Sequence, residues 1–172
     1  MKYFFRVIRQ AEVANMVEVR LVPMNKKEFE VMRAAGVKRY ADENVKAGYW
    51  KPAEALKRSE ATHANLLPDG LHTEGHHFYK ALDAETEERV GQLWLKVEPG
   101  EDRKGFIFDV FIDEGSRGKG YGRAMMLALE TKAKRMKIDS LALHVFAYNE
   151  VARHLYGSLG YEVKSLNMMK GL

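Results

Sequence analysis

The chain has 172 residues, enough for one domain with its own hydrophobic core, and carries 28 Lys and Arg against 24 Asp and Glu. Cysteine is absent, which excludes a disulfide framework, a thiolate metal site and a cysteine nucleophile. The formal charge of +4 suits an anionic small ligand as well as a nucleic acid.

The N-terminus has no signal-peptide pattern, and no apolar run approaches the ~20 residues that span a bilayer. We therefore expect a cytoplasmic protein without a membrane partner. One domain is expected over residues 1–172, with residues 1–15 as an N-terminal extension that fits no element clearly.

The first third reads as strand, helix, helix. Alternating apolar and polar residues predict a strand over 17–23, which Pro23 ends. Asn25 is placed to cap a helix that Gly48 stops. A second helix is predicted from Pro52 to about Leu67, because proline is favoured in a first turn.

The middle of the chain reads as three strands. Residues 76–82 and 90–97 predict an antiparallel hairpin joined by the acidic loop 83–88. Residues 105–112 form a nearly continuous apolar run, which predicts a strand buried on both faces.

In the last third, apolar residues recur at helical spacing from Met125 to Met136. A strand over 140–146, a short helix capped by Asn149 and stopped by Gly160, and a last strand over 161–169 follow. The order β-α-α-β-β-β-α-β-α-β predicts an α/β fold with a mixed sheet.

A glycine-rich turn separates the strand over 105–112 from the long helix. Backbone N–H groups at a helix N-terminus lack partners within the helix, and the macrodipole adds positive charge there. Glycines let phosphates approach closely, and Arg117, Lys119 and Arg123 add mobile positive charge. We predict a diphosphate site over residues 117–122; a tight connection without a ligand is the alternative.

Two nucleotide motifs fit this turn poorly. A P-loop needs Ser or Thr after Gly-Lys, but Gly120 follows Lys119. The Rossmann fingerprint fails on its glycine spacing. The turn therefore predicts neither ATP nor NAD.

The pattern Arg117-x-x-Gly120-x-Gly122 after an apolar strand resembles the acetyl-CoA signature of the GNAT superfamily of N-acetyltransferases. The segment with Val145, Asn149, Ala152, Leu155-Tyr156 and Gly160-Tyr161 is similar to the family segment that completes the cofactor site. The resemblance runs from Val17 to the end. It implies a GNAT-like fold with a splayed central sheet, acetyl-CoA as cosubstrate, and transfer of the acetyl group to a primary amine by direct attack.

The resemblance also assigns residues. It implies that backbone groups of Val110 and Ile112 hold the pantetheine arm and acetyl carbonyl. The remaining implied cofactor-binding residues are Arg117, Gly118, Lys119, Gly120, Tyr121, Gly122, Arg123, Asn149, Ala152 and Tyr156. Tyr156 matches the family position of the general acid; a tyrosine packed half in the core is the other interpretation.

The general base is harder to assign. Asp109 lies in the middle of an apolar strand, where burial would help its carboxylate accept a proton. A buried carboxylate satisfied by hydrogen bonds is an equal alternative. His144 either borders the cofactor or points to solvent or a neighbour. Tyr49 and Trp50 resemble acceptor-pocket residues in placement, and core anchors are the alternative.

No metal is expected, because His72, His76 and His77 lack the H-E-x-x-H arrangement. The alternatives to catalysis are a catalytically silent CoA-binding sensor and a nucleic-acid binder that uses Lys132, Lys134, Arg135 and Lys137. No aromatic residues are interleaved with those cations, so no nucleic-acid partner is expected. The expected partners are acetyl-CoA and an amine-bearing acceptor of open identity, with a homodimer through the C-terminal strands as a further alternative.

Overall fold

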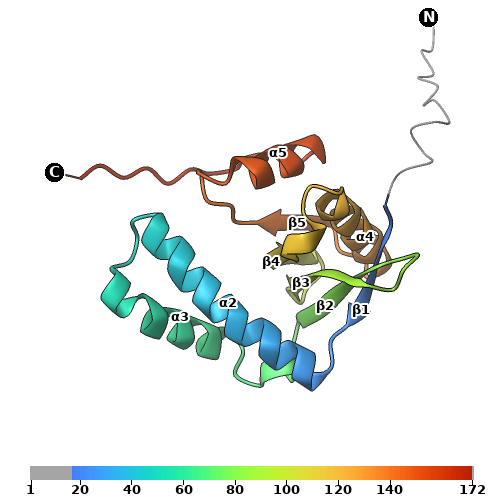
Figure 1. The fold of residues 1–172 in the computed structure, drawn as a ribbon, viewed down its shortest axis with the longest axis horizontal. Coiled ribbons are helices and arrows are strands. Elements are labelled where there is room, and N and C mark those ends of the chain that lie inside the picture. The colour runs from blue at the N-terminus through green and yellow to red at the C-terminus, as the bar shows by residue number, and fades with distance from the viewer. Residues whose placement is uncertain (1–16, 172) are drawn as a thin grey trace, which may run out of the picture.

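A computed structural model describes residues 17–171 and contains a five-stranded sheet in the order β1-β2-β3-β4-β5 (Figure 1). The first four strands are antiparallel to their neighbours, and β5 runs parallel to β4. The strands are β1 (Val19–Pro23), β2 (His76–Asp83), β3 (Arg89–Val97), β4 (Lys104–Ile112) and β5 (Ser140–Leu143). The predicted α/β fold with a mixed sheet is confirmed.

Four α-helices connect and cover these strands: α2 (Lys26–Lys46), α3 (Pro52–Leu66), α4 (Tyr121–Arg135) and α5 (Glu150–Ser158). Two 3-10 turns also occur, η1 (Gly70–His72) and η2 (Glu114–Ser116). Asn25 caps α2 in a capping box with Glu28, and Asn149 caps α5 by accepting a hydrogen bond from Ala152 N. Both predicted caps are confirmed. Within residues 17–171, no helix has the length and apolar character needed to cross a membrane.

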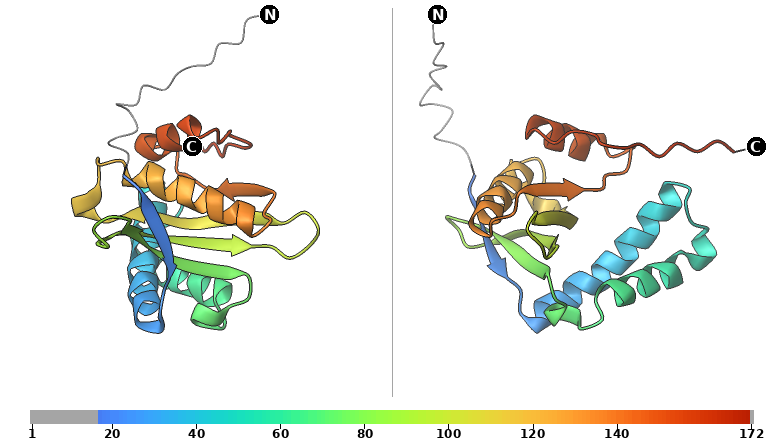
Figure 2. Two further views of the ribbon diagram at one scale, coloured as in Figure 1. Left: turned by 90° about the vertical axis from the view of Figure 1, so that its right-hand side faces the viewer. Right: turned by 180° about the vertical axis from the view of Figure 1, so that it is seen from behind.

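The helices cover the two faces of the sheet (Figure 2). On one face, α4 places Met125, Met126 and Leu129 against the buried Leu93 and Leu95 of β3. On the other face, side chains around α2 and α3 pack on β2 and β3; they are Met24, Phe29, Met32, Leu67, Phe78 and Trp94. Complete burial of one such large apolar side chain contributes about 1.5–3 kcal/mol.

A β-bulge in β4 changes the direction of its side chains. Trp94 of β3 pairs with Asp109, but Leu95 pairs with Ile107, so Phe108 is the extra residue. As a result Phe108 and Asp109 both lie on the face covered by α2 and α3. Val110 returns to the face covered by α4.

The bulge also marks where β4 and β5 separate. The two strands pair from Lys104 with Ser140 to Ile107 with Leu143, immediately before Phe108. The predicted strand over 140–146 therefore ends early, at Leu143. From Phe108 to Ile112, β4 is only half buried, so the expectation of burial on both faces is wrong. On the side away from β3, this half of β4 borders a cleft instead of a neighbouring strand.

The predicted last strand is also wrong. Residues 161–171 follow α5 without regular structure, and the apolar side chains of Val163, Leu166 and Met168 are exposed. The sequence pattern is strand-like, but a strand needs a partner backbone, and none pairs with this segment within residues 17–171. The expectation about residues 1–15 falls outside the described part of the chain.

Candidate active site

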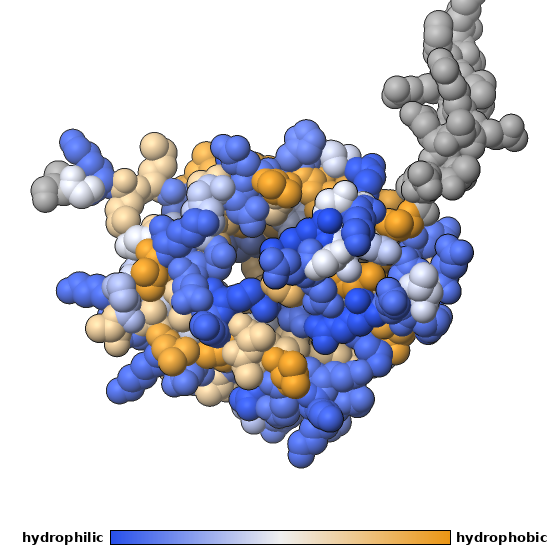
Figure 3. Space-filling model, viewed as in Figure 1, coloured by the Kyte–Doolittle hydropathy of each residue, from blue (hydrophilic) through white to orange (hydrophobic). Residues whose placement is uncertain are grey.

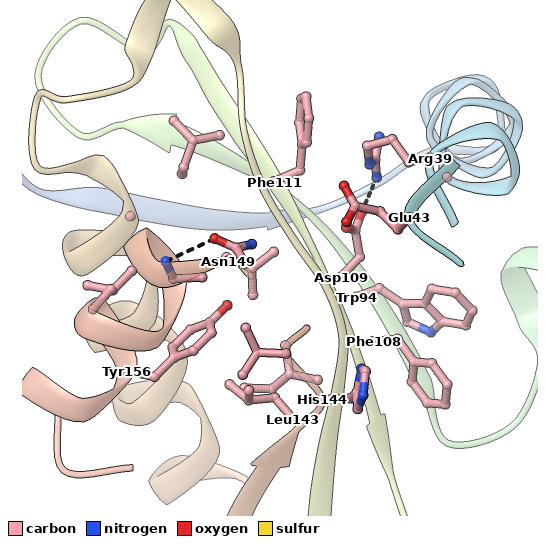
Figure 4. Close-up of a pocket in the computed structure, with 18 of the residues that line it drawn as sticks. Arg39, Glu43, Trp94, Phe108, Asp109, Phe111, Leu143, His144, Asn149 and Tyr156 are labelled. Carbon is pink, nitrogen blue, oxygen red and sulfur yellow. Dashed lines mark hydrogen bonds and ion pairs between the residues drawn. The ribbon is translucent and has the colours of Figure 1, made fainter. Parts of the chain in front are cut away.

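A cleft of about 1110 Å³ opens where β4 and β5 diverge. The N-terminus of α4, the helix α5 and the half-buried residues 108–112 of β4 line one part of it, and α2, α3 and β3 line the rest. The space-filling view shows this face of the molecule hollowed near its centre (Figure 3). Figure 4 shows side chains from these elements around the cleft.

The N-terminus of α4 opens toward this cleft without a side-chain cap. Its N-cap residue is Gly120, which has no side chain to accept from the first-turn N–H groups. The N-caps of α2 and α5, in contrast, are Asn25 and Asn149, both of which accept such bonds. The α4 end therefore keeps its backbone donors and the positive end of its dipole available to an anion.

The glycines of the turn serve different purposes. Gly118 and Gly120 have φ angles of +72° and +90°, which L side chains rarely adopt. A Cβ at Gly122 would lie 3.3 Å from Leu155 Cδ2, so this glycine also lets α5 approach the first turn of α4. The turn thus combines an open backbone with close packing of the two helices.

The three cations of the turn lie at the protein surface. The Arg117 Nε donates to the carbonyl of Ile112 at 3.1 Å, and its guanidinium lies 5.3 Å from the centre of the Phe111 ring. Arg123 donates to Ser158 Oγ at 2.9 Å. Lys119 donates to the carbonyl of Gly115 at 2.6 Å and does not line the cleft. Every other predicted cofactor-binding residue does.

Tyr156 lies half-buried on α5 and points toward the opening between β4 and β5 (Figure 4). Burial, together with the negative charge of Asp109, raises the pKa of the Tyr156 phenol to about 12. The phenol therefore holds its proton at neutral pH. It is suited to donate a proton or a hydrogen bond and not to accept a proton.

Asp109 has two hydrogen-bond donors on the α2 side of the sheet. Its Oδ2 accepts from the Arg39 guanidinium at 2.7 Å and from Gln92 Nε2 at 2.9 Å. Within residues 17–171 both bonds go to Oδ2, so Oδ1 keeps its acceptor capacity. The carboxylate is thus partly hydrogen-bonded, as one interpretation expected, and still borders the cleft.

The sequence model of the acetyltransferase (GNAT) family matches residues 30–161, well over half of the chain. The chain belongs to the GNAT family of acetyltransferases. The matched region includes all four helices except the start of α2, and it includes β2 to β5.

Two curated GNAT relatives are similar over nearly their whole length. The N-acetyltransferase YycN of Bacillus subtilis strain 168, described as uncharacterized, is 39% identical over 155 residues, 90% of this chain and 99% of YycN. YdgE of the same strain, also described as an uncharacterized N-acetyltransferase, is 35% identical over 153 residues, 88% of this chain and 97% of YdgE. The crystal structure of YycN matches with a TM-score of 0.86 over 90% of this chain and 98% of that one.

In this GNAT chain, the residues of the cleft that sequence reasoning missed include Arg39, Glu43, Trp94 and Phe108. A signal existed for the two on α2. Gly36, Arg39, Tyr40 and Glu43 recur at helical spacing, and all line the cleft. No comparable signal marked Phe108, because a bulge is fixed by pairing with another strand.

The remaining candidates lie as follows. His144 lines the cleft (Figure 4). Tyr49 and Trp50 do not line it; Trp50 packs edge-on against Tyr40, with ring centres 5.3 Å apart. His76 accepts at Nδ1 from Trp94 Nε1 at 2.8 Å, so that nitrogen is engaged in a structural hydrogen bond.

Proposed function

We propose that the protein transfers the acetyl group of acetyl-CoA to a primary amine by direct attack. Membership in the acetyltransferase family supports this reaction class. The observation that carries the proposal is the uncapped N-terminus of α4, which opens into one continuous cleft beside the half of β4 that has no partner on the β5 side.

In this proposal, the turn at residues 117–123 binds the pyrophosphate of CoA. The backbone N–H groups around Gly120 meet the phosphate oxygens, and Arg117 and Arg123 neutralise their charge. Lys119 contributes only by releasing its bond to Gly115. The backbone of Val110 and Ile112 binds the pantetheine arm, because β4 lacks a partner strand on that side beyond Ile107.

Asn149 and Ala152 are proposed to close the site from α5. Their own hydrogen bond fixes the start of that helix, and both residues line the cleft. This arrangement places Tyr156 one turn further along the same helix. The proposed cofactor site therefore extends from the α4 turn to the middle of α5.

The acceptor nitrogen loses two protons in the reaction, of which one is balanced by the proton supplied to the departing thiolate and the other is released to solvent. The acceptor ammonium loses a proton, and the amine attacks the thioester carbonyl carbon. A C–N bond forms, the C–S bond breaks, and the nitrogen releases its second proton. We assign Tyr156 as the acid that protonates the departing thiolate, since its phenol keeps its proton at neutral pH.

Asp109 is proposed to accept the proton from the amine, directly or through water, at its open Oδ1. The alternative role is structural, since Oδ2 holds α2 against β4 through Arg39. Replacing Asp109 by Asn separates the two. A base predicts a loss of kcat with a changed pH–rate profile, whereas a structural role predicts an unchanged profile and a lower melting temperature.

The decisive experiment has two steps on the purified protein. Calorimetry with acetyl-CoA tests binding, and a screen of amines that monitors free-thiol release tests transfer. Absence of binding heat contradicts the whole proposal. Binding without transfer to any amine points instead to a catalytically silent CoA-binding sensor.

A further inference from the structure

The part of the cleft not assigned to CoA lies between α2, α3 and β4, and its composition defines the acceptor. The inference that follows deepens the proposed function and depends on it. We call this part the acceptor half and define it by Arg39, Glu43, His63, Trp94, Phe106 and Phe108, all of which line the cleft.

The floor of the acceptor half is aromatic. Trp94 and Phe108 stack with ring centres 4.6 Å apart, and Phe106 meets Phe108 edge-on at 4.9 Å. Trp94 is buried, while Phe106 and Phe108 are half-buried and present ring surface to the cleft. The bulge places Phe108 on this face beside Asp109. Such a floor favours an apolar or aromatic body of a ligand.

Most charges in the acceptor half already have partners. Arg39 pairs with Asp109 at 2.7 Å and lies 4.3 Å from the centre of the Phe111 ring. Arg33, at the edge of the cleft, pairs with Glu30 at 2.7 Å. Burial lowers the pKa of His63, so its ring is neutral at pH 7.

Glu43 is the exception. None of the ion pairs formed within residues 17–171 includes it, and its carboxylate accepts a hydrogen bond from the Tyr148 phenol. Lys46, the nearby cation, lies over the Tyr148 ring, 4.1 Å from its centre. Glu43 is half-buried on α2, lines the cleft and lies one helical turn after Arg39, which pairs with Asp109 (Figure 4). The acceptor half thus contains one carboxylate without a cation.

We propose that the acceptor is a primary amine on an apolar or aromatic body without a carboxylate, whose ammonium binds Glu43 while its body lies on Phe106 and Phe108. A ligand carboxylate would need an arginine that is already paired. A second ammonium of a polyamine would find no second carboxylate without a cation. The aromatic floor and the single Glu43 carboxylate together therefore select an aryl-alkyl monoamine.

The test compares three acceptors at fixed acetyl-CoA by free-thiol release: 2-phenylethylamine, L-phenylalanine and spermidine. The first two differ only in a carboxylate, and the third has several amines and no ring. We expect kcat/KM for 2-phenylethylamine to exceed both others by roughly tenfold or more, the effect of one charged group left unpaired. Preference for L-phenylalanine or spermidine would overturn the inference.

Glu43→Gln tests the proposed contact. The KM for 2-phenylethylamine should rise by roughly tenfold or more, with an unchanged KM for acetyl-CoA. Tyr148→Phe, which removes the hydrogen bond to Glu43, should raise the same KM less. Asp42→Asn, an exposed neighbour on α2 outside the cleft, is the matched control and should behave as the wild type.

The result also separates this inference from the proposed function. Failure of acetyl-CoA to bind in calorimetry contradicts the proposed function itself. If acetyl-CoA binds but no thiol is released, calorimetry of 2-phenylethylamine on the CoA-bound protein decides. Absence of binding, or binding that Glu43→Gln leaves unchanged, rejects the inference about the acceptor alone.

Discussion

At the scale of single residues, two tyrosines near the cleft have similar environments, but we expect their replacement by phenylalanine to change different properties of the protein. Tyr156 and Tyr161 lie with ring centres 5.8 Å apart, and burial raises the pKa of each phenol to about 12. Tyr156 lines the cleft, whereas the Tyr161 hydroxyl is buried without a hydrogen-bond partner among residues 17–171. One hydroxyl belongs to a residue that lines the cleft, and the other is a cost to stability.

Tyr156→Phe should lower kcat by roughly a hundredfold if the phenol protonates the leaving thiolate. The KM for acetyl-CoA should change little, because the ring remains. Steady-state kinetics provides the measurement, and Tyr49→Phe, an exposed phenol outside the cleft, provides the control. In the wild type, ionisation of Tyr156 should not affect the rate below about pH 11, since the pKa of its phenol lies near 12. An unchanged kcat would remove Tyr156 from the mechanism.

Tyr161→Phe should raise the free energy of unfolding by about 1 kcal/mol, because it removes a buried hydroxyl that has lost its water and gained no partner. Urea denaturation measures the change. Tyr121→Phe is the opposite case, because the Tyr121 hydroxyl donates to Asp83 Oδ2 at 2.7 Å. Removing this hydrogen bond should lower the free energy of unfolding. Destabilisation by Tyr161→Phe would mean that its hydroxyl has a partner after all.

At the scale of elements, the turn before α4 depends on backbone conformation. Gly120→Ala places a Cβ at a φ of +90° and 3.3 Å from Val17 Cγ2, at a cost of about 1–2 kcal/mol. We expect the turn to shift and the Kd for acetyl-CoA to rise by roughly tenfold, measured by calorimetry. Gly115→Ala lies in the same loop, where a Cβ meets no atom within 4 Å, and should leave the Kd unchanged. Equal Kd values for the two variants would refute the proposed phosphate site.

Elements defined by local chemistry were predictable from the sequence. Asn25 and Asn149 cap helices through their own side chains, and Gly160 has the left-handed φ of +90° expected after a helix. The burial of β4, and whether residues 161–169 form a strand, depend on which other segment of backbone lies beside them. That information is not present in the periodicity of one segment.

The candidate site likewise has a part that local sequence predicts and a part that depends on contacts between distant residues. The glycine turn and the α5 motif are each one short continuous stretch of sequence, and the structure brings the two stretches to one cleft. The contacts of the acceptor half join distant residues: Arg39 and Asp109 are 70 positions apart, and Glu43 and Tyr148 are 105 apart. Only the fold brings these pairs together, so single-sequence reasoning found Asp109 without its partner and missed Glu43.

At the scale of the whole molecule, Asp83 links the β2–β3 loop to α4. Its carboxylate accepts from the backbone N–H of Thr86, the phenol of Tyr121 and the N–H of Glu85, and these bonds lower its pKa to about 2. The folded state thus favours the charged form. The stability it contributes is fully present above about pH 4 and is lost as the pH falls toward 2.

Melting temperatures measured from pH 6 to pH 2 test this linkage. The wild type should lose stability between about pH 4 and pH 2, and Asp83→Asn should lose less over the same range, because its amide does not titrate. Asp42→Asn serves as the control, since its side chain is exposed and takes part in none of the ion pairs within residues 17–171. Parallel curves for wild type and Asp83→Asn would show that Asp83 is not the linked group.

The single extra residue Phe108 determines how regular the sheet is next to β5. If Phe108 were deleted, Ile107 and Asp109 would become neighbours, and every remaining side chain of β4 would keep its present face. The strand would lose its bend, and β5 would have a straight partner to follow beyond Leu143. A chain of 171 residues would therefore form a more regular sheet in which β4 and β5 stay paired, without the opening that is proposed to receive the pantetheine arm.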